Sequence, residues 1–416
     1  MKTLPAFAPA LAGDGPRPGD RDRAAAVRHP IAIERIDPDA VQVLRRLVRA
    51  GHVAYLVGGG VRDLLLGRAP KDFDVGTSAR PLQVRALFRN CRIIGRRFRL
   101  AHVFFRDGKV IEVATFRRDP SSRSEHDEGT GRDLLIRSDN VYGEPHEDAA
   151  RRDFTINGLF YDIEREQVID HVGGLLDVQR RLLRTIGDPD VRLREDPVRI
   201  LRAIKFAARL DLGIDPALYD AMVEHRGQLV RAAPARVLEE ILRLLRGGAA
   251  HRSVALAWDT GALSVVLPEV ASFLDDDAEG ASLLWARLGA CDRRQRAGRL
   301  PSDPVLLLAL LSGALEEALH EARDPAAALD GFFEPLVRRL VLPRRMRERI
   351  RQVLYAQRRL ATGRHAAIAG RDFYDDAVTW FCIEREARGQ PVPEWARASP
   401  SRDASVRRDA TRPAAG

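Results

Sequence analysis

The sequence predicts an α+β fold, in which a mixed sheet with helices forms the N-terminal part of the chain and helices alone form the rest. Three observations predict this fold. Within residues 54–75, an apolar strand-like run ends in three glycines, opens a helix and is followed by a second strand. Two further strand-like runs meet around Asp107-Gly108, a dipeptide typical of hairpins. From about Ile214 onward, apolar residues recur at helical spacing.

The composition favours a negatively charged partner and a reducing compartment. The 416 residues are enough for two or three domains, and the formal charge of +9 makes nucleic acid the first candidate partner. Cys91, Cys291 and Cys382 form no C-x-x-C pair, which argues against a disulfide framework or a zinc site. Because no apolar run reaches the length of a membrane-spanning helix, we expect a cytoplasmic protein without a membrane partner.

The elements of the first half follow from local patterns. Residues 1–29 are rich in proline, glycine and arginine and are expected to be an unfolded tail, since prolines interrupt the apolar run LPAFAPALA. Residues 37–50 have the apolar spacing of a helix that packs beside the first strand. The other expected elements are helices at 61–66 and 81–90 and strands at 54–57, 71–75, 91–94, 98–105, 110–116, 159–163 and 167–171.

The glycine turn at residues 58–60 predicts a phosphate-binding site. Glycine lets backbone N–H groups approach a ligand closely, and the helix that begins there directs its N-terminal dipole at the ligand. We therefore expect Gly59 and Gly60 to contact a nucleotide, with Arg62 adding a positive charge. The spacing fits neither a Walker loop nor a Rossmann fingerprint.

Two carboxylates follow the turn, and a third lies further along the chain. Side chains alternate across a strand, so Asp72 and Asp74 share one face, as a pair of divalent cations would require. A glycine turn or a strand-end Asp-x-Asp alone is more often plain structure, but their order within so short a span favours catalysis. Glu112 lies among apolar residues, where an isolated carboxylate is costly. It is either a third catalytic carboxylate or the partner of an arginine.

Three motifs carry a resemblance to a known family. GGGVRDLLLG followed by KDFDV, then RRDFTIN, then REDPVR resemble the bacterial poly(A) polymerase and CCA-adding tRNA nucleotidyltransferase family. This resemblance implies a head of the DNA polymerase beta type, followed by an all-helical neck and body. It implies that Glu112 joins Asp72 and Asp74 in catalysis. It also implies that Arg152 lies near the nucleotide and Asp153 near the sugar or catalytic centre. The other interpretation of these two residues is a salt-bridged helix end.

Asp196 and Pro197 have a structural and a chemical interpretation. Asp is a good helix N-cap and Pro a good first helical residue. A carboxylate beside a guanidinium can also accept a hydrogen bond from an exocyclic amine and donate one to a ring nitrogen, a pattern that suits adenine and cytosine. An Asp196–Arg199 pair would then admit ATP and CTP. The resemblance agrees that this motif selects the base, and Arg202 is expected in the same nucleotide site.

The helical remainder contains one strongly basic segment. Residues 343–360 interleave apolar residues with seven arginines, which form either a solvated face or contacts to RNA phosphates. The long polar segment 117–142 is either a functional flap or a plain loop. The expected domains are an unfolded tail (1–29), a catalytic head (30–172), a neck with the base-selecting helix (173–232), a helical RNA-binding body (233–397) and a second unfolded tail (398–416).

The predicted activity is template-independent transfer of AMP from ATP to the 3′ end of RNA, from mRNA or other transcripts. Asp72 and Asp74 would hold two Mg²⁺ ions, with Mn²⁺ as the alternative ion. The run Ile94–Val103, IGRRFRLAHV, resembles poly(A) polymerases, whereas CCA-adding members tend to have Gly-Thr after the phenylalanine. CCA addition to tRNA from CTP and ATP remains the alternative.

Two other classes fit less well. An inactive RNA-binding protein would have lost a catalytic carboxylate, and a small-molecule nucleotidyltransferase would not need the long basic body. The sequence implies no obligate protein partner.

Overall fold

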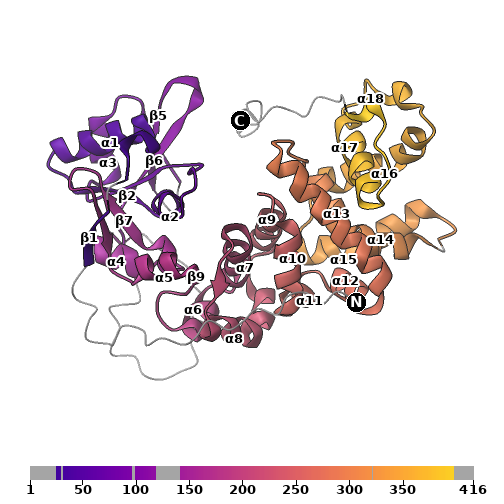
Figure 1. Ribbon diagram of the computed structural model, residues 1–416, viewed down its shortest axis with the longest axis horizontal. Coiled ribbons are helices and arrows are strands. Elements are labelled where there is room, and N and C mark those ends of the chain that lie inside the picture. The colour runs from indigo at the N-terminus through magenta and orange to yellow at the C-terminus, as the bar shows by residue number, and fades with distance from the viewer. Residues whose placement is uncertain (1–24, 30, 96–98, 119–140, 321, 398–416) are drawn as a thin grey trace. The chain divides into compact units, whose positions relative to one another are not determined.

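The computed structural model describes residues 25–29, 31–95, 99–118, 141–320 and 322–397, and divides into two compact units (Figure 1). The first unit takes in the chain up to Glu195 together with Gly213–Leu218. The second takes in Asp196–Leu212 and the chain from Tyr219 onward. The expected boundary between head and neck, after residue 172, therefore falls inside the first unit.

A mixed sheet of eight strands forms the first unit, as predicted. Its order is β1-β8-β7-β2-β3-β6-β5-β4, and all neighbours pair antiparallel except β3 and β6, which are parallel. The strands are β1 (Ala25–Arg28), β2 (Ala54–Val57), β3 (Asp74–Thr77), β4 (Cys91–Ile94), β5 (Leu100–Phe104), β6 (Val110–Thr115), β7 (Leu159–Asp162) and β8 (Gln167–Asp170).

β1 corrects the prediction of an unfolded tail over residues 1–29. Residues 25–28 pair antiparallel with β8, with Ala25 opposite Asp170 and Arg28 opposite Gln167. Composition misled here, because an edge strand of four residues needs few apolar side chains once a neighbouring strand supplies the hydrogen bonds. Residues 1–24, the tail 398–416 and most of the polar segment 117–142 lie outside the described residues. The described ends of that segment, Arg117 and Tyr142, form a β-bridge.

Helices of the first unit cover the sheet. α1 packs on β2 and β3, α3 packs on β4 and β5, and the two helices contact each other, so both cover one face (Figure 1). The Asp37 carboxylate caps α1 by accepting from the N–H of Asp39, and it also pairs with Lys109 beside the β5–β6 turn. The helices are α1 (Pro38–Arg49), α2 (Gly59–Leu65), α3 (Pro81–Leu87), α4 (Pro145–Ala150), α5 (Gly174–Arg180) and α6 (Pro189–Glu195).

A short ladder closes the first unit. β9 (Leu182–Leu183) pairs parallel with β10 (Gly213–Ile214), which follows the excursion of the chain into the second unit. α5 and α6 were not predicted, because PDVRLRE in α6 has only two apolar residues and no helical period.

The second unit is helical, as predicted. Val305 to Leu311 in α14 are all buried, and the fully buried Arg287 of α13 pairs with Glu316 and Glu384. No helix in the described parts of the chain is both long and apolar enough to cross a membrane. The helices are α7 (Val198–Leu210), α9 (Pro234–Leu245), α10 (Ala250–Asp259), α11 (Ala262–Val266), α12 (Pro268–Asp276), α13 (Ala278–Arg296), α14 (Asp303–His320), α15 (Pro325–Leu340), α16 (Arg344–Ala361), α17 (Tyr374–Ala387) and α18 (Glu394–Arg397); α8 (Pro216–His225) begins in the first unit.

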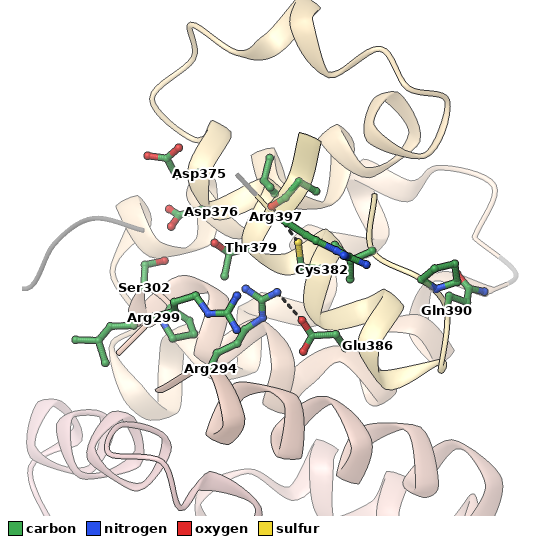
Figure 2. A pocket seen from close by; sticks show the side chains of 16 residues that line it. Arg294, Arg299, Ser302, Asp375, Asp376, Thr379, Cys382, Glu386, Gln390 and Arg397 are labelled. Atoms are coloured by element: carbon green, nitrogen blue, oxygen red, sulfur yellow. Dashed lines mark hydrogen bonds and ion pairs between the residues drawn. The ribbon is translucent and has the colours of Figure 1, made fainter. Parts of the chain in front are cut away.

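A pocket of about 450 Å³ is lined by α13, the loop that follows it, α17 and α18 (Figure 2). Arg294 of α13 donates to Glu386 over 2.6 Å. The other charged residues that line the pocket are Arg299, Arg397, Asp375 and Asp376. Positive and negative groups therefore balance, and the lining gives no preference for an anion.

Two glycines in the helices of the second unit make a matched test of packing. A Cβ at Gly313 in α14 would lie 2.1 Å from Cε1 of Phe273, whereas a Cβ at Gly331 in α15 would meet nothing within 4 Å. We expect Gly313→Ala to destabilise the protein by about 1–3 kcal/mol through overpacking. Gly331→Ala should stabilise it by up to about 1 kcal/mol, because alanine is the better helix former. Thermal unfolding of both variants checks this, and equal melting temperatures would contradict the packing.

Candidate active site

The glycine turn brings other site residues close to the backbone. Gly58 has φ 66°, and α2 begins at Gly59, two residues earlier than predicted. A Cβ at Gly58 would lie 2.9 Å from Nη1 of Arg152, and one at Gly60 would lie 3.5 Å from the carbonyl oxygen of Asp72. The turn therefore needs glycine both for its dihedral angles and for the approach of Arg152.

Strand register places two of the predicted carboxylates side by side. β3 begins at Asp74, later than predicted, so Asp72 lies just before the strand. In the parallel β3–β6 pair, Val75 lies opposite Val113. Asp74 and Glu112 each come one residue earlier, so their side chains project from the same face of the sheet.

The same face also carries Arg152. Asp74 lies opposite Val57 of β2, and Val57 lies opposite Phe160 of β7. The guanidinium of Arg152 lies over the Phe160 ring, 5.3 Å from its centroid. Residues directly opposite one another project to one face, so Asp74, Glu112 and Arg152 meet on one side of the sheet.

Burial and nearby negative charge change the titration of Asp74. Burial, followed by the carboxylates of Glu112 and Asp72, raises the pKa of Asp74 to about 6, and only Arg152 opposes this rise. Three carboxylates with unfavourable mutual repulsion supply the hard oxygen ligands that a divalent cation prefers. The chemistry of these carboxylates suits a divalent cation, but their oxygens do not all lie within 4.8 Å of one another in the described structure, so the metal site stays a prediction.

The residue beside Glu112 is a histidine, and not the arginine of the alternative interpretation. Its carboxylate lies 3.6 Å from Nε2 of His102, which is directly opposite on β5. The side chain of Glu112 is about half exposed. It can therefore turn toward a ligand at little desolvation cost.

Arg62, which follows the glycine turn in α2, links Asp63 to Asn157 and, through Asn157, to Asp153. It is buried, its Nε and Nη2 donate to Asp63 over 2.9 and 2.7 Å, and its Nη1 donates to Oδ1 of Asn157 over 2.6 Å. Asn157 in turn donates to Oδ1 of Asp153 over 3.0 Å. These contacts fix Asn157 and Asp153, so the role of Arg62 toward phosphate stays a prediction.

Asp148, which sequence reasoning missed, orients the two arginines of the RRD motif. Its Oδ2 accepts from Nε and Nη2 of Arg152 over 3.1 and 2.9 Å, and its Oδ1 accepts from Arg151. Although burial raises the pKa of Asp148, the ion pairs with Arg152 and Arg151 leave that pKa below its ordinary value. Arg152 thus forms an ion pair with Asp148, four residues earlier, a spacing that can be read from the sequence.

Arg192 of α6 fastens the backbone of the same motif. Its Nη2 donates to the carbonyl oxygens of Arg151 and Arg152 over 2.9 and 2.8 Å, and its Nη1 donates to Glu195 over 2.8 Å. Arg192 is buried. Arg192 lies about 40 residues after the motif, so no local sequence pattern predicts this contact.

The predicted base-selecting residues belong to the second unit. α7 begins at Val198 with Pro197 as its N-cap and no side-chain capping bond, so the prediction of Asp196 as N-cap is wrong. Its carboxylate instead accepts two hydrogen bonds from Arg236 of α9, over 3.1 and 2.9 Å. Arg199 is buried on α7, and the Asp196–Arg199 pair stays a prediction.

Arg202 is also on α7, and its Nη1 lies 3.9 Å from Oε1 of Glu240. Its role toward the nucleotide likewise stays a prediction.

Comparison with known proteins identifies the family. The family described as "Poly A polymerase head domain" matches residues 54–184, and "Probable RNA and SrmB- binding site of polymerase A" matches residues 211–274. Poly(A) polymerase I of Salmonella typhimurium is 40% identical over 349 residues, which are 80% of this chain and 74% of that protein. The chain belongs to the bacterial poly(A) polymerase and CCA-adding enzyme family. It is accordingly a nucleotidyltransferase, as predicted.

Members of both activities are among the relatives. The CCA-adding enzyme of Geobacillus thermodenitrificans is 35% identical over 255 residues, 61% of this chain and 60% of that protein. The crystal structure of the Bacillus stearothermophilus CCA-adding enzyme in complex with CTP aligns with a TM-score of 0.63 at 27% identity, over 87% of this chain and 81% of that one. This similarity confirms the predicted fold class. The poly(A) polymerase relative matches at higher identity and over more of the chain, which supports the predicted activity.

The raised pKa of Asp74 predicts a stability gain when its charge is removed. In the folded protein Asp74 holds its proton up to about pH 6, but in the unfolded chain it loses it near pH 3.8, so its ionisation destabilises the fold increasingly as pH rises between these values. In EDTA at pH 8, we expect Asp74→Asn to stabilise the protein by up to about 3 kcal/mol. The gain should shrink toward pH 5, and nucleotide incorporation should be lost.

Thermal unfolding at both pH values and an incorporation assay with Mg²⁺ measure these effects. A variant that retains incorporation would contradict the catalytic role of Asp74. A melting temperature equal to that of the wild type at pH 8 would contradict the raised pKa of Asp74.

The contacts of Asp148 predict a specific effect on nucleotide affinity. Asp148→Asn leaves Arg152 without its charged partner, so we expect the KM for ATP to rise about tenfold or more, with a smaller change in kcat. Asp292→Asn is a matched control, because Asp292 is equally buried but accepts from the N–H of Ala250 in the second unit. Steady-state kinetics on both variants check this. If Asp148→Asn only lowers the melting temperature, its role is structural.

Proposed function

We propose that this chain is a template-independent polynucleotide adenylyltransferase that transfers AMP from ATP to the 3′-hydroxyl of RNA. The observation that carries the proposal is the meeting of Asp74, Glu112 and Arg152 on one face of the sheet, beside the glycine turn. The relatives named poly(A) polymerase I support the choice of ATP and of RNA 3′ ends. We expect the reaction to take place in the cytoplasm.

The carboxylates are the proposed metal ligands. Asp72 and Asp74 would hold two divalent cations, Mg²⁺ by preference and Mn²⁺ as a substitute, with Glu112 as the third catalytic carboxylate. When bound, such ions lower the pKa of the attacking hydroxyl and neutralise charge on the phosphates. Binding relieves the repulsion that raises the pKa of Asp74, so the folded protein gains stability when the ions are present.

The remaining residues bind and orient the nucleotide. Arg152, held by Asp148, presents a guanidinium to the triphosphate, and Gly59 and Gly60 offer backbone N–H groups at the start of α2. Asp153 is held by Asn157 for a role near the sugar or the reacting centre. Because no covalent intermediate is needed, positioning and charge stabilisation account for the catalysis.

Base selection is proposed for Asp196 with Arg199 and Arg202. A carboxylate has about four acceptor sites, so Asp196 can accept from an exocyclic amine while it stays paired with Arg236. Arg236 would then orient the carboxylate rather than compete with the base. This arrangement selects adenine and cytosine over guanine and uracil, so it does not distinguish poly(A) synthesis from CCA addition.

The β4–β5 hairpin favours poly(A) synthesis over CCA addition. The run that resembles poly(A) polymerases ends in β5, and its His102 contacts Glu112 directly. Differences in this run can therefore alter the position of a catalytic carboxylate. Residues 96–98 of the run lie outside the described residues. CCA addition to tRNA is the second candidate, favoured by the relatives with that name.

Product sequencing distinguishes the two activities. ATP alone, CTP alone and both together are supplied with Mg²⁺ to an unstructured RNA and to a tRNA that lacks its terminal CCA. We expect long adenosine tails on the unstructured RNA from ATP alone, because no residue of the proposed site limits addition to three nucleotides. Growth that stops after C, C and A on the tRNA, with the other RNA untouched, would establish CCA addition instead.

A further inference from the structure

α16 is the most basic helix of the second unit, and its two faces differ. It carries seven arginines and one glutamate. Ile350, Val353, Ala356 and Leu360 are buried and fall on one side of the helix, which packs on α14 and α17. Helical periodicity places the opposite side in solvent.

Ion pairs separate two of the seven arginines from four others, while Arg347, which is only partly exposed, belongs to neither group. Arg349 pairs with Asp372 over 2.7 Å, and Arg351 pairs with Asp330. The arginines of the second group are exposed and make no ion pair among the residues that the structure describes: Arg344, Arg345, Arg358 and Arg359. Their charges are therefore available to a partner.

An exposed aromatic side chain lies at the centre of this group. Tyr355 is 50% exposed, and Arg358 and Arg359 follow it by three and four residues, so they lie on the same side of the helix. From Arg344 to Arg359 the helix extends about 22 Å. Arg351, on the same side, is paired with Asp330, and the carboxylate of Glu348 lies 4.0 Å from Arg351.

We infer that the α16 basic face, formed by Arg344, Arg345, Tyr355, Arg358 and Arg359, binds single-stranded RNA upstream of its 3′ end. Proteins that bind single strands combine cations that contact phosphates with aromatic rings on which bases stack. Charge complementarity favours a polyanion over an apolar partner. The inference rests on the proposed function for the identity of the RNA. α16 lies outside residues 211–274, to which the RNA-binding family model is limited.

The test measures binding of the full chain to a labelled unstructured RNA across a KCl series, without ATP. Arg358→Ala combined with Arg359→Ala should lower affinity, and it should reduce the slope of log K against log salt by about 1.4, or 0.7 for each lost phosphate contact. Arg293→Ala combined with Arg323→Ala is the control, since both arginines are exposed, lie in the same unit and make no ion pair among the described residues. The control should bind like the wild type.

Tyr355 gives an independent test of stacking. Tyr355→Ala should weaken binding by about fivefold or more with an unchanged salt slope, because stacking involves no counterion release. Tyr355→Phe keeps the ring and should restore wild-type affinity. Wild-type binding by the double arginine variant or by Tyr355→Ala would overturn the inference and leave the face solvated or open to an acidic protein. Because binding is measured without nucleotide, this outcome is separate from whether the chain adds AMP.

Discussion

The parallel pairing of β3 with β6 is the constraint on which the catalytic end of the first unit depends. It places the half-buried Asp74 beside the half-exposed Glu112 on one face of the sheet, where burial and the nearby carboxylate disfavour ionisation of Asp74. Folding therefore has to stabilise this arrangement from elsewhere. The apolar face beneath it, built on Val75 and Val113, and the packing of α1 on the sheet provide that stabilisation. The repulsion between these carboxylates is the property that suits the proposed site to cations.

Arg152 brings a positive charge to the same face of the sheet, and its neighbours fix its orientation. Arg152 would be a flexible side chain on its own, but the carboxylate of Asp148, the carbonyl of Asn157 and the ring of Phe160 leave it one orientation. Arg192 fixes the backbone from which it projects. Pre-organisation of this kind lowers the entropy cost of the triphosphate contact proposed for Arg152. The buried Asp148 therefore acts on the proposed triphosphate contact through Arg152 and not by direct contact.

Local sequence patterns explain which parts of the fold and of the candidate site could be predicted. β2 and β4 begin and end as predicted, because apolar runs bounded by turn residues are local signals. Asp72, Asp74, Glu112 and the RRD motif were picked out from local patterns and from the family resemblance, and their roles in the reaction stay predictions. Arg236 and Arg192 were missed, since each acts on a residue about 40 positions away, and no local pattern encodes such a contact. β1 was missed because its partner strand, rather than its own composition, holds it in place.

The discontinuous first unit has a consequence for synthesis on the ribosome. The chain leaves this unit after Glu195 and returns at Gly213 to pair β10 with β9. The eight-stranded sheet is complete in sequence by Asp170, but the β9–β10 ladder needs residue 214. A nascent chain that has been synthesised only as far as Glu195 has no β10 with which β9 can pair. The first unit therefore cannot finish folding before part of the second has been translated.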